Sequence, residues 1–264
     1  MKFVHKVSKG SRFNQIYVPK EMESVFDIGD IVEVRLLEKS LKLCYSKNLL
    51  KLTEFKEKLI SEIFSFLSKF KEIEQIFVVG SFLTQKIEYN DIDIVVITDN
   101  KKIEETVYNK LVDRFNLKFH VISISKKNLS SLEQICPLTR SMFYYNISNK
   151  EFNLSLDKKI DKKHIEFLLM MPEDILEINV NSRVFYDNMR RLITIEGFLE
   201  GKDEDPIKVD DELKILIGEL LFNYVKNNEN LDTKEIKKLR EIIKMKLVKI
   251  NRLLKWVKQR LFMS

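Results

Sequence analysis

The 264-residue sequence lacks most features of secreted, zinc-stabilised or membrane-spanning chains. Its only two cysteines, Cys44 and Cys136, are far apart and have no metal-type spacing, so we expect free thiols in a reducing cytoplasm. The three histidines form no HExxH motif and no cluster with cysteine, which argues against structural zinc. No stretch of about 20 uncharged apolar residues occurs, and the first residues lack a signal-peptide pattern. We therefore expect a cytoplasmic protein with no membrane partner.

What the sequence does contain points to a folded chain of two or three domains. Hydrophobic residues make up 44% of it, including 18 phenylalanines, which is ample for a core. There is no internal repeat or low-complexity segment. The formal net charge of +6 permits an anionic partner such as a nucleotide or nucleic acid, although charges of both signs are abundant.

Three blocks of different pattern divide the chain, and we expect one domain in each. Residues 1–50 show short alternating segments with glycine-marked turns, which predicts a small β domain. Residues 51–152 alternate amphipathic helices with apolar strands, which predicts a small α/β sheet. Residues 153–264 have helical periodicity almost throughout, which predicts an all-α domain. The strands expected in the first block are Phe3–Val7, Gln15–Val18, Ile31–Leu36 and Leu41–Tyr45.

Within the second block the expected order is helix, strand, strand, helix, strand. Apolar residues three or four apart predict helices over Leu52–Phe70 and Ile103–Phe115, and short apolar runs predict the strands. In the third block we expect two helices and then a long final helix that begins near Thr233, a good N-cap residue. The remaining predicted elements are strands at Ile76–Val79, Ile92–Ile97 and Phe119–Ile124, and helices at Phe185–Leu199 and Glu212–Tyr224.

Two aspartates on the second predicted strand suggest a metal site. Asp91 and Asp93 are two residues apart, so their side chains point to the same face of the strand. Transfer of a nucleotidyl group requires neutralisation of charge on attacking and leaving oxygens, and Mg²⁺ bound to carboxylates can supply it. Gly80 and Ser81 follow the preceding strand, where a glycine lets phosphate approach the backbone and a serine adds a donor.

This arrangement, Gly-Ser followed about ten residues later by Asp-x-Asp, resembles the signature of nucleotidyltransferases of the DNA polymerase β type. The resemblance implies a nucleoside triphosphate substrate, with Gly80 and Ser81 at its phosphates, and Mg²⁺ or Mn²⁺ at Asp91 and Asp93. The family usually carries a third carboxylate on a later strand, and here His120 occupies that position. A neutral imidazole can ligate metal or act as a base. Equally, the change can mark a pocket that binds nucleotide with little or no turnover.

Two further residues are candidates for contact with the triphosphate. Small nucleotidyltransferases often carry an arginine in a helix just after the core sheet, and Arg140 occupies a comparable place. Lys86 lies in the loop between the two halves of the motif. For Arg140, a helix-surface position without a function is an equally good reading.

The first block resembles the AbrB/MazE swapped-hairpin family, through Lys6–Arg12, Ile16–Glu21 and Phe26–Val34. In that family two chains interlace their strands into one barrel, because so short a unit cannot bury enough surface alone. The resemblance implies a homodimer that presents basic residues to DNA. The residues that would contact DNA are Lys6, Lys9, Arg12 and Lys20. Retention of dimerisation without DNA binding stays open.

The final helix is rich in lysine and arginine, so it can follow a phosphate backbone, lie on a membrane surface, or simply pack through its apolar stripe. The expected fold is a nucleotidyltransferase α/β core (α+β in topology), with a β swapped-hairpin domain before it and an all-α domain after it. The expected function is metal-dependent transfer of a nucleoside monophosphate to a hydroxyl of nucleic acid, such as RNA, or of protein. The alternative is a DNA-binding regulator of antitoxin type with a degenerate nucleotide-binding domain.

Overall fold

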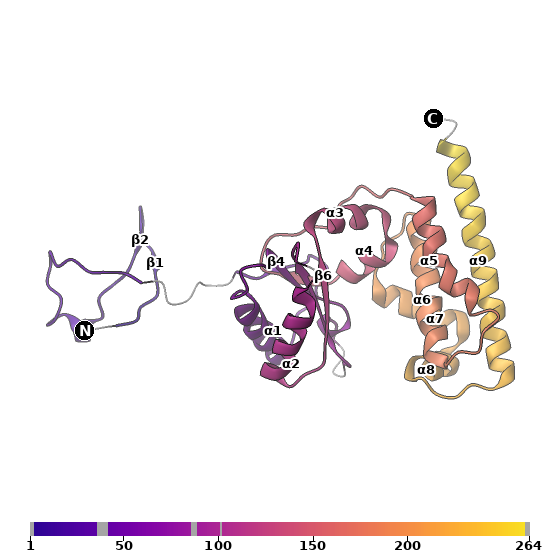
Figure 1. Cartoon of the computed structure of the whole chain (residues 1–264), viewed down its shortest axis with the longest axis horizontal. Helices are drawn as coiled ribbons and strands as arrows, with labels where there is room; N and C mark the ends of the chain where they lie inside the picture. Colours follow the sequence, from indigo (N-terminus) through magenta and orange to yellow (C-terminus); the bar gives the residue numbers. More distant parts are fainter. Residues whose placement is uncertain (1–2, 36–41, 86–88, 101, 262–264) are drawn as a thin grey trace. The chain divides into compact units, whose positions relative to one another are not determined.

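The computed structural model describes residues 3–35, 42–85, 89–100 and 102–261, with side chains as far as residue 256. The chain forms two compact units, Met1–Ser40 and Leu41–Ser264. Both are drawn in Figure 1, and each is described by itself below.

The first unit has little regular structure in its described residues. β1 (Ser8–Lys9) pairs with β2 (Asn14–Gln15) in an antiparallel ladder, and η1 (Lys20–Met22) is a single 3₁₀ turn after Pro19. The predicted strands at 3–7 and 31–35 are not formed, because no neighbouring segment pairs with their backbone groups. Residue 36 of the predicted strand Ile31–Leu36 and residue 41 of the predicted strand Leu41–Tyr45 lie outside the described residues. No side chain from residue 3 to 35 is buried.

A five-stranded mixed sheet forms the centre of the second unit, in the order β3-β7-β4-β5-β6. Only β5 and β6 run parallel. The sequence analysis did not predict β7. It assigned the segment containing β3 to the first domain, whereas β3 pairs with β7. The strands are β3 (Cys44–Tyr45), β4 (Gln75–Val79), β5 (Ile92–Ile97), β6 (Phe119–Ile124) and β7 (Asn146–Ser148).

Helices cover both faces of this sheet. Alternate residues of β4 and β5, such as Val78 and Ile94, pack against α1 (Glu54–Leu67) and α2 (Ile103–Phe115). The other set, such as Phe77 and Val95, packs against residues of two shorter helices. These are α3 (Lys126–Ile135) and α4 (Pro137–Phe143). Figure 1 shows the two pairs of helices around the sheet.

The rest of the unit is helical, as predicted, and has a core of its own centred on α6. The predicted helix at 212–224 is wrong in one respect: Gly218, with φ +88°, separates two helices there. None of the described helices has an apolar stretch long enough to cross a bilayer. The helices are α5 (Lys162–Asp174), α6 (Ser182–Leu199), α7 (Pro206–Ile217), α8 (Glu219–Asn227) and α9 (Thr233–Leu261).

The start of α9 differs slightly from the prediction. Asp232, not Thr233, caps the helix: its Oδ1 accepts from the backbone N–H of Glu235 at 2.7 Å. The Glu235 carboxylate accepts in return from the Asp232 N–H at 2.9 Å. This reciprocal capping box satisfies two backbone donors that the helix itself cannot pair.

Candidate active site

The candidate site lies at one end of the sheet, where β4 ends and β5 begins. β4 ends at Val79, and Gly80 then turns the chain with φ +80° into a 3₁₀ turn, η2 (Ser81–Leu83). A β-carbon on Gly80 would overlap Oδ2 of Asp93, which pairs across the strands with Val79. Glycine is therefore required at position 80 for two reasons: the positive φ and the approach of the Asp93 carboxylate.

Asp93 also faces His120 on the next strand. The two residues are register partners in the parallel pair β5–β6, and the Nδ1 atom of His120 lies 3.0 Å from Oδ1 of Asp93. With this carboxylate as acceptor, Nδ1 carries the proton and donates it. The His120 side chain is 59% exposed, against 25% for Asp93, so His120 forms the solvent side of the pair.

The carboxylates at this edge form a region of negative potential. Burial raises the pKa of the Asp93 carboxyl, the His120 hydrogen bond opposes that rise, and the charge of Asp91 adds to it. Asp91 is partly buried and immediately precedes β5. Among the described residues, no group of three or more acidic, histidine or cysteine side chains is placed to hold a metal ion.

A buried lysine supports the loop between the two halves of the motif, and the sequence analysis missed it. Lys56 lies in the first turn of α1 with only 5% of its surface exposed, and its Nζ donates to the Thr84 carbonyl at 2.8 Å. The ammonium also lies 5.1 Å from the ring centroid of Phe82 and 5.8 Å from that of Tyr89. Burial lowers the pKa of Lys56. These contacts hold the chain just after Ser81 to the chain just before Asp91.

A signal for Lys56 is present in the sequence. It lies four residues after Leu52 and three before Leu59, on the apolar stripe of the helix. Phe55, which also lies at helical spacing from Leu52 and Leu59, is 62% exposed.

Residues 61–146 match the family model described as Polymerase beta, Nucleotidyltransferase. The match spans the second half of α1, both halves of the Gly-Ser and Asp-x-Asp motif, and His120. It supports the nucleotidyltransferase superfamily for this segment and a function in nucleotidyl transfer. No curated protein matched the chain.

Arg140 lies inside this nucleotidyltransferase segment, on α4, but its guanidinium is buried against protein acceptors. Its Nε lies 3.2 Å from Oε2 of Glu204, and its NH1 donates to the carbonyls of Glu133 and Ser155. Lys158 pairs with the other Glu204 oxygen at 2.7 Å. These contacts favour a structural role for Arg140 over the predicted contact with triphosphate.

A second contact joins the nucleotidyltransferase segment to the same loop of the helical region. The Tyr145 hydroxyl donates to Oδ1 of Asp205 at 3.0 Å, and that oxygen also accepts from the backbone N–H of Ile207 to cap α7. Burial raises the pKa of Tyr145, and the Asp205 hydrogen bond adds to the rise. The loop before α7 is therefore anchored by two consecutive buried acids, Glu204 and Asp205.

The remaining predicted residues lie as follows. Ser81 is exposed at the start of η2, in reach of solvent beside Gly80. Lys86 lies outside the described residues. In the first unit, all four predicted DNA contacts are exposed: Lys6, Lys9, Arg12 and Lys20.

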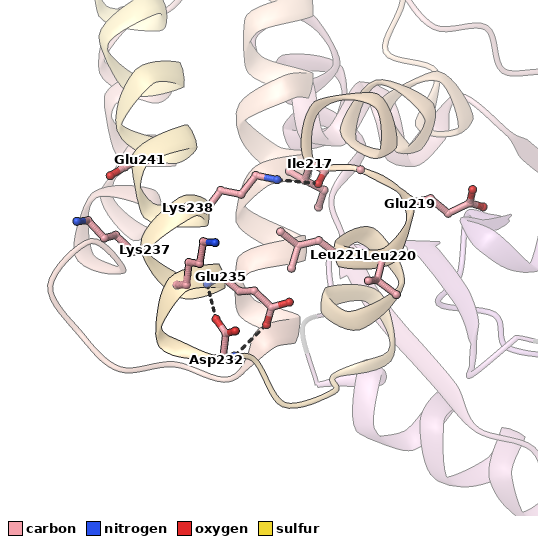
Figure 2. A pocket seen from close by; sticks show the side chains of 11 residues that line it. Ile217, Glu219, Leu220, Leu221, Asp232, Glu235, Lys237, Lys238 and Glu241 are labelled. Carbon is pink, nitrogen blue, oxygen red and sulfur yellow. Dashed lines mark hydrogen bonds between the residues drawn. The ribbon is translucent and has the colours of Figure 1, made fainter.

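A pocket of about 720 Å³ opens elsewhere, between the start of α8 and the first turns of α9 (Figure 2). Its polar groups already serve the helix ends: Asp232 and Glu235 form the capping box, and Lys238 donates to the Ile217 carbonyl at 3.2 Å. Cationic and anionic side chains alternate around its rim, as Lys237 and Glu241 illustrate. We assign no ligand to this pocket.

Proposed function

We propose that the second unit is a metal-dependent nucleotidyltransferase that moves a nucleoside monophosphate from a nucleoside triphosphate to an acceptor hydroxyl. The observation that carries the proposal is the approach of the Asp93 carboxylate to Gly80. It brings the proposed metal-binding residue and the proposed phosphate-binding residue together at one end of the sheet. The family match over residues 61–146 supports the same reaction class.

The donor set fits a hard divalent cation. Mg²⁺ is commonly bound by one or two protein carboxylates together with waters and substrate phosphates, so Asp91 and Asp93 are sufficient protein ligands. Burial raises the pKa of Asp93 and the charge of Asp91 adds to the rise, and a bound cation would oppose both effects. When bound, Mg²⁺ or Mn²⁺ would neutralise charge on the reacting phosphate oxygens.

The chain's own residues bind and orient the substrate. The Gly80 backbone leaves room for the phosphates, and the exposed Ser81 hydroxyl is available to donate to them. His120 holds Asp93 through its Nδ1–H, so the carboxylate keeps one oxygen engaged and one beside Gly80. His120, at the position where the family usually carries a third carboxylate, thus orients Asp93 in this chain.

The reaction can be tested by pyrophosphate release from each of the four nucleoside triphosphates with Mg²⁺ or Mn²⁺, with nucleic-acid and protein acceptors. The Asp91→Ala/Asp93→Ala variant should lose the activity. Asp99→Ala, which removes an exposed carboxylate just beyond β5, should retain it. If the wild type and the double variant are equally inert in every combination, the regulator with a degenerate pocket replaces the enzyme.

For the first unit we propose pairing with a second copy of the chain and contact with DNA. The supporting observation is that residues 3–35 bury no side chain, although many are large and apolar. Such a unit needs a partner to remove these surfaces from water. More than half of the surface is exposed at Val4, Val7, Phe13, Tyr17, Ile28, Ile31, Val32 and Val34.

Two measurements test this second proposal. Light scattering should give the mass of a dimer, and a monomer would contradict the pairing. DNA retention should fall in Lys9→Ala/Arg12→Ala. Unchanged retention would show that these two residues do not contact DNA. A wild-type dimer that retains no DNA would leave a module that only dimerises.

A further inference from the structure

The long helix α9 has two different faces. The inner face packs against α5 and α6 in the helical core and is apolar. Its buried members repeat at helical spacing: Leu239, Ile243, Leu247, Ile250 and Leu254. The outer face therefore has to be interpreted separately from the stripe that holds the helix in place.

The basic residues of α9 fall into two groups. Those at the margins of the inner face are used within the bundle: Lys246 pairs with Glu196 at 2.8 Å, and Lys249 with Glu196 and Glu200. Lys238 and Arg240 donate to backbone carbonyls of neighbouring segments. The burial of Glu196 explains the two lysines that pair with it, Lys246 and Lys249.

The second group of basic residues lies away from these contacts within the bundle. It projects from the outer face at spacings of seven, eight and three residues, which keeps its members on one side of the helix. All four are exposed, and within the described part of the chain none of them makes an ion pair. The group comprises Lys237, Lys244, Arg252 and Lys255, and we call it the outer basic row.

Apolar side chains lie among these charges. Met245, Val248 and Trp256 are 62%, 45% and 49% exposed and project from the same side as the outer basic row. Trp256 is the only tryptophan of the chain and lies next to Lys255. One acid, Glu241, shares this face, so the row keeps a net positive charge.

We propose that the outer face of α9 binds a single-stranded nucleic acid, with phosphates along the outer basic row and a base stacked on Trp256. From Lys237 to Lys255 the helix rises roughly 27 Å, long enough for several successive phosphates. Basic side chains combined with an exposed aromatic ring are the pattern that single strands require, because every base has a face that can stack.

A membrane surface fits the geometry less well. A helix lying in a bilayer inserts its apolar face, and the apolar face of α9 is already buried against α5 and α6. The three apolar residues left outside are separated by charges. The binding proposed here goes beyond nucleotidyl transfer and does not depend on it.

Trp256 supplies the test, because its fluorescence reports on α9 alone even if the first unit also binds DNA. The full-length protein should be titrated with a short oligo(U), a matching oligo(dT), and vesicles with and without phosphatidylserine. We expect both oligonucleotides to change the tryptophan emission in a saturable, salt-sensitive way, and the vesicles to leave it unchanged.

The decisive variant is Lys244→Gln/Arg252→Gln/Lys255→Gln, with Lys58→Gln/Lys69→Gln/Lys71→Gln as a control that removes three exposed charges in and near α1. The α9 variant should weaken binding at least about tenfold at 0.1 M salt. It should also flatten the dependence of log Kd on log salt by about two units, since each phosphate contact to a single strand contributes ~0.7. Circular dichroism confirms that the helix is intact.

Three results would overturn the proposal. The first is unchanged tryptophan emission with both oligonucleotides. The second is equal affinity in the α9 variant and its control. The third is a response to phosphatidylserine vesicles in the absence of any response to oligonucleotides, which would assign the face to a membrane. A response to oligo(U) alone, or to oligo(dT) alone, would support the proposal and name the nucleic acid.

Discussion

The Asp93 carboxylate occupies the space where a side chain of Gly80 would begin. This relationship explains why the two halves of the motif depend on one another. The positive φ of Gly80 turns the chain away from β4, and the missing side chain lets an acid from β5 lie against the turn. Replacement of either residue therefore alters the position of the other.

Gly80→Ala should lower turnover by about 100-fold or more, since a displacement of ~1 Å at a reacting centre can have that effect. It should also cost about 1–2 kcal/mol of folding free energy, because an alanine at positive φ is strained. Gly201→Ala is the matched control, since Gly201 has φ +76° with open space around it. Both variants should lose stability in urea denaturation. Equal turnover in the two variants would show that the position of Asp93 does not depend on Gly80.

His120→Asp should restore the third carboxylate that the resemblance leads one to expect. It places a second acid beside Asp93, so calorimetry should show divalent-cation binding strengthened roughly tenfold, or ~1.4 kcal/mol. His120→Asn keeps a polar side chain without the charge and should bind the cation no more tightly than the wild type. Weaker cation binding in His120→Asp than in His120→Asn would show that position 120 does not face the cation.

Lys56→Met should impair nucleotide binding while leaving the fold intact. The variant keeps the apolar stem but loses the hydrogen bond to Thr84 and the contacts with Phe82 and Tyr89, together worth about 1–2 kcal/mol. We expect KM for the nucleoside triphosphate to rise roughly tenfold, with a smaller change in kcat. Lys56→Arg should recover part of the loss. A fall in melting temperature with unchanged kinetics would restrict Lys56 to stability.

Arg140→Met should act on stability and not on nucleotide binding. Removal of one partner from a buried ion pair costs about 3–5 kcal/mol, and here it leaves Glu204 with Lys158 as its cationic partner and the Glu133 and Ser155 carbonyls without this donor. Arg140→Met/Glu204→Gln should cost less than the single change, as measured by chemical denaturation. A large rise in KM for the nucleoside triphosphate with unchanged stability would instead show that Arg140 contacts the triphosphate.

Local patterns were sufficient to predict the elements that hold the site. The bounds predicted for β5, α2 and β6 agree with the structure, because each is a strongly patterned segment between clear breaks. The pairing of Asp93 with His120 then follows from two adjacent parallel strands in register. Local patterns did not state that these strands are adjacent; the resemblance to the family is what placed His120 near Asp91 and Asp93.

Contacts between distant segments could not be predicted in this way. Glu204 lies between the predicted helices Phe185–Leu199 and Glu212–Tyr224, and its partner Arg140 is 64 residues earlier in the chain. Gly218 looked compatible with a helical pattern, because a sequence does not state the φ angle that a glycine adopts. The strands of the first unit depended on a pairing partner, which periodicity does not supply.

The two acids before α7 have a consequence for how this protein could be divided. A fragment that ended at residue 152 would keep Arg140 and Tyr145 but lose Glu204 and Asp205, the buried acids that pair with their side chains. The transferase segment is thus not suited to transfer into another protein on its own. An engineered chimera that contains it should therefore include the acidic loop of the helical region, or replace Arg140 at the same time.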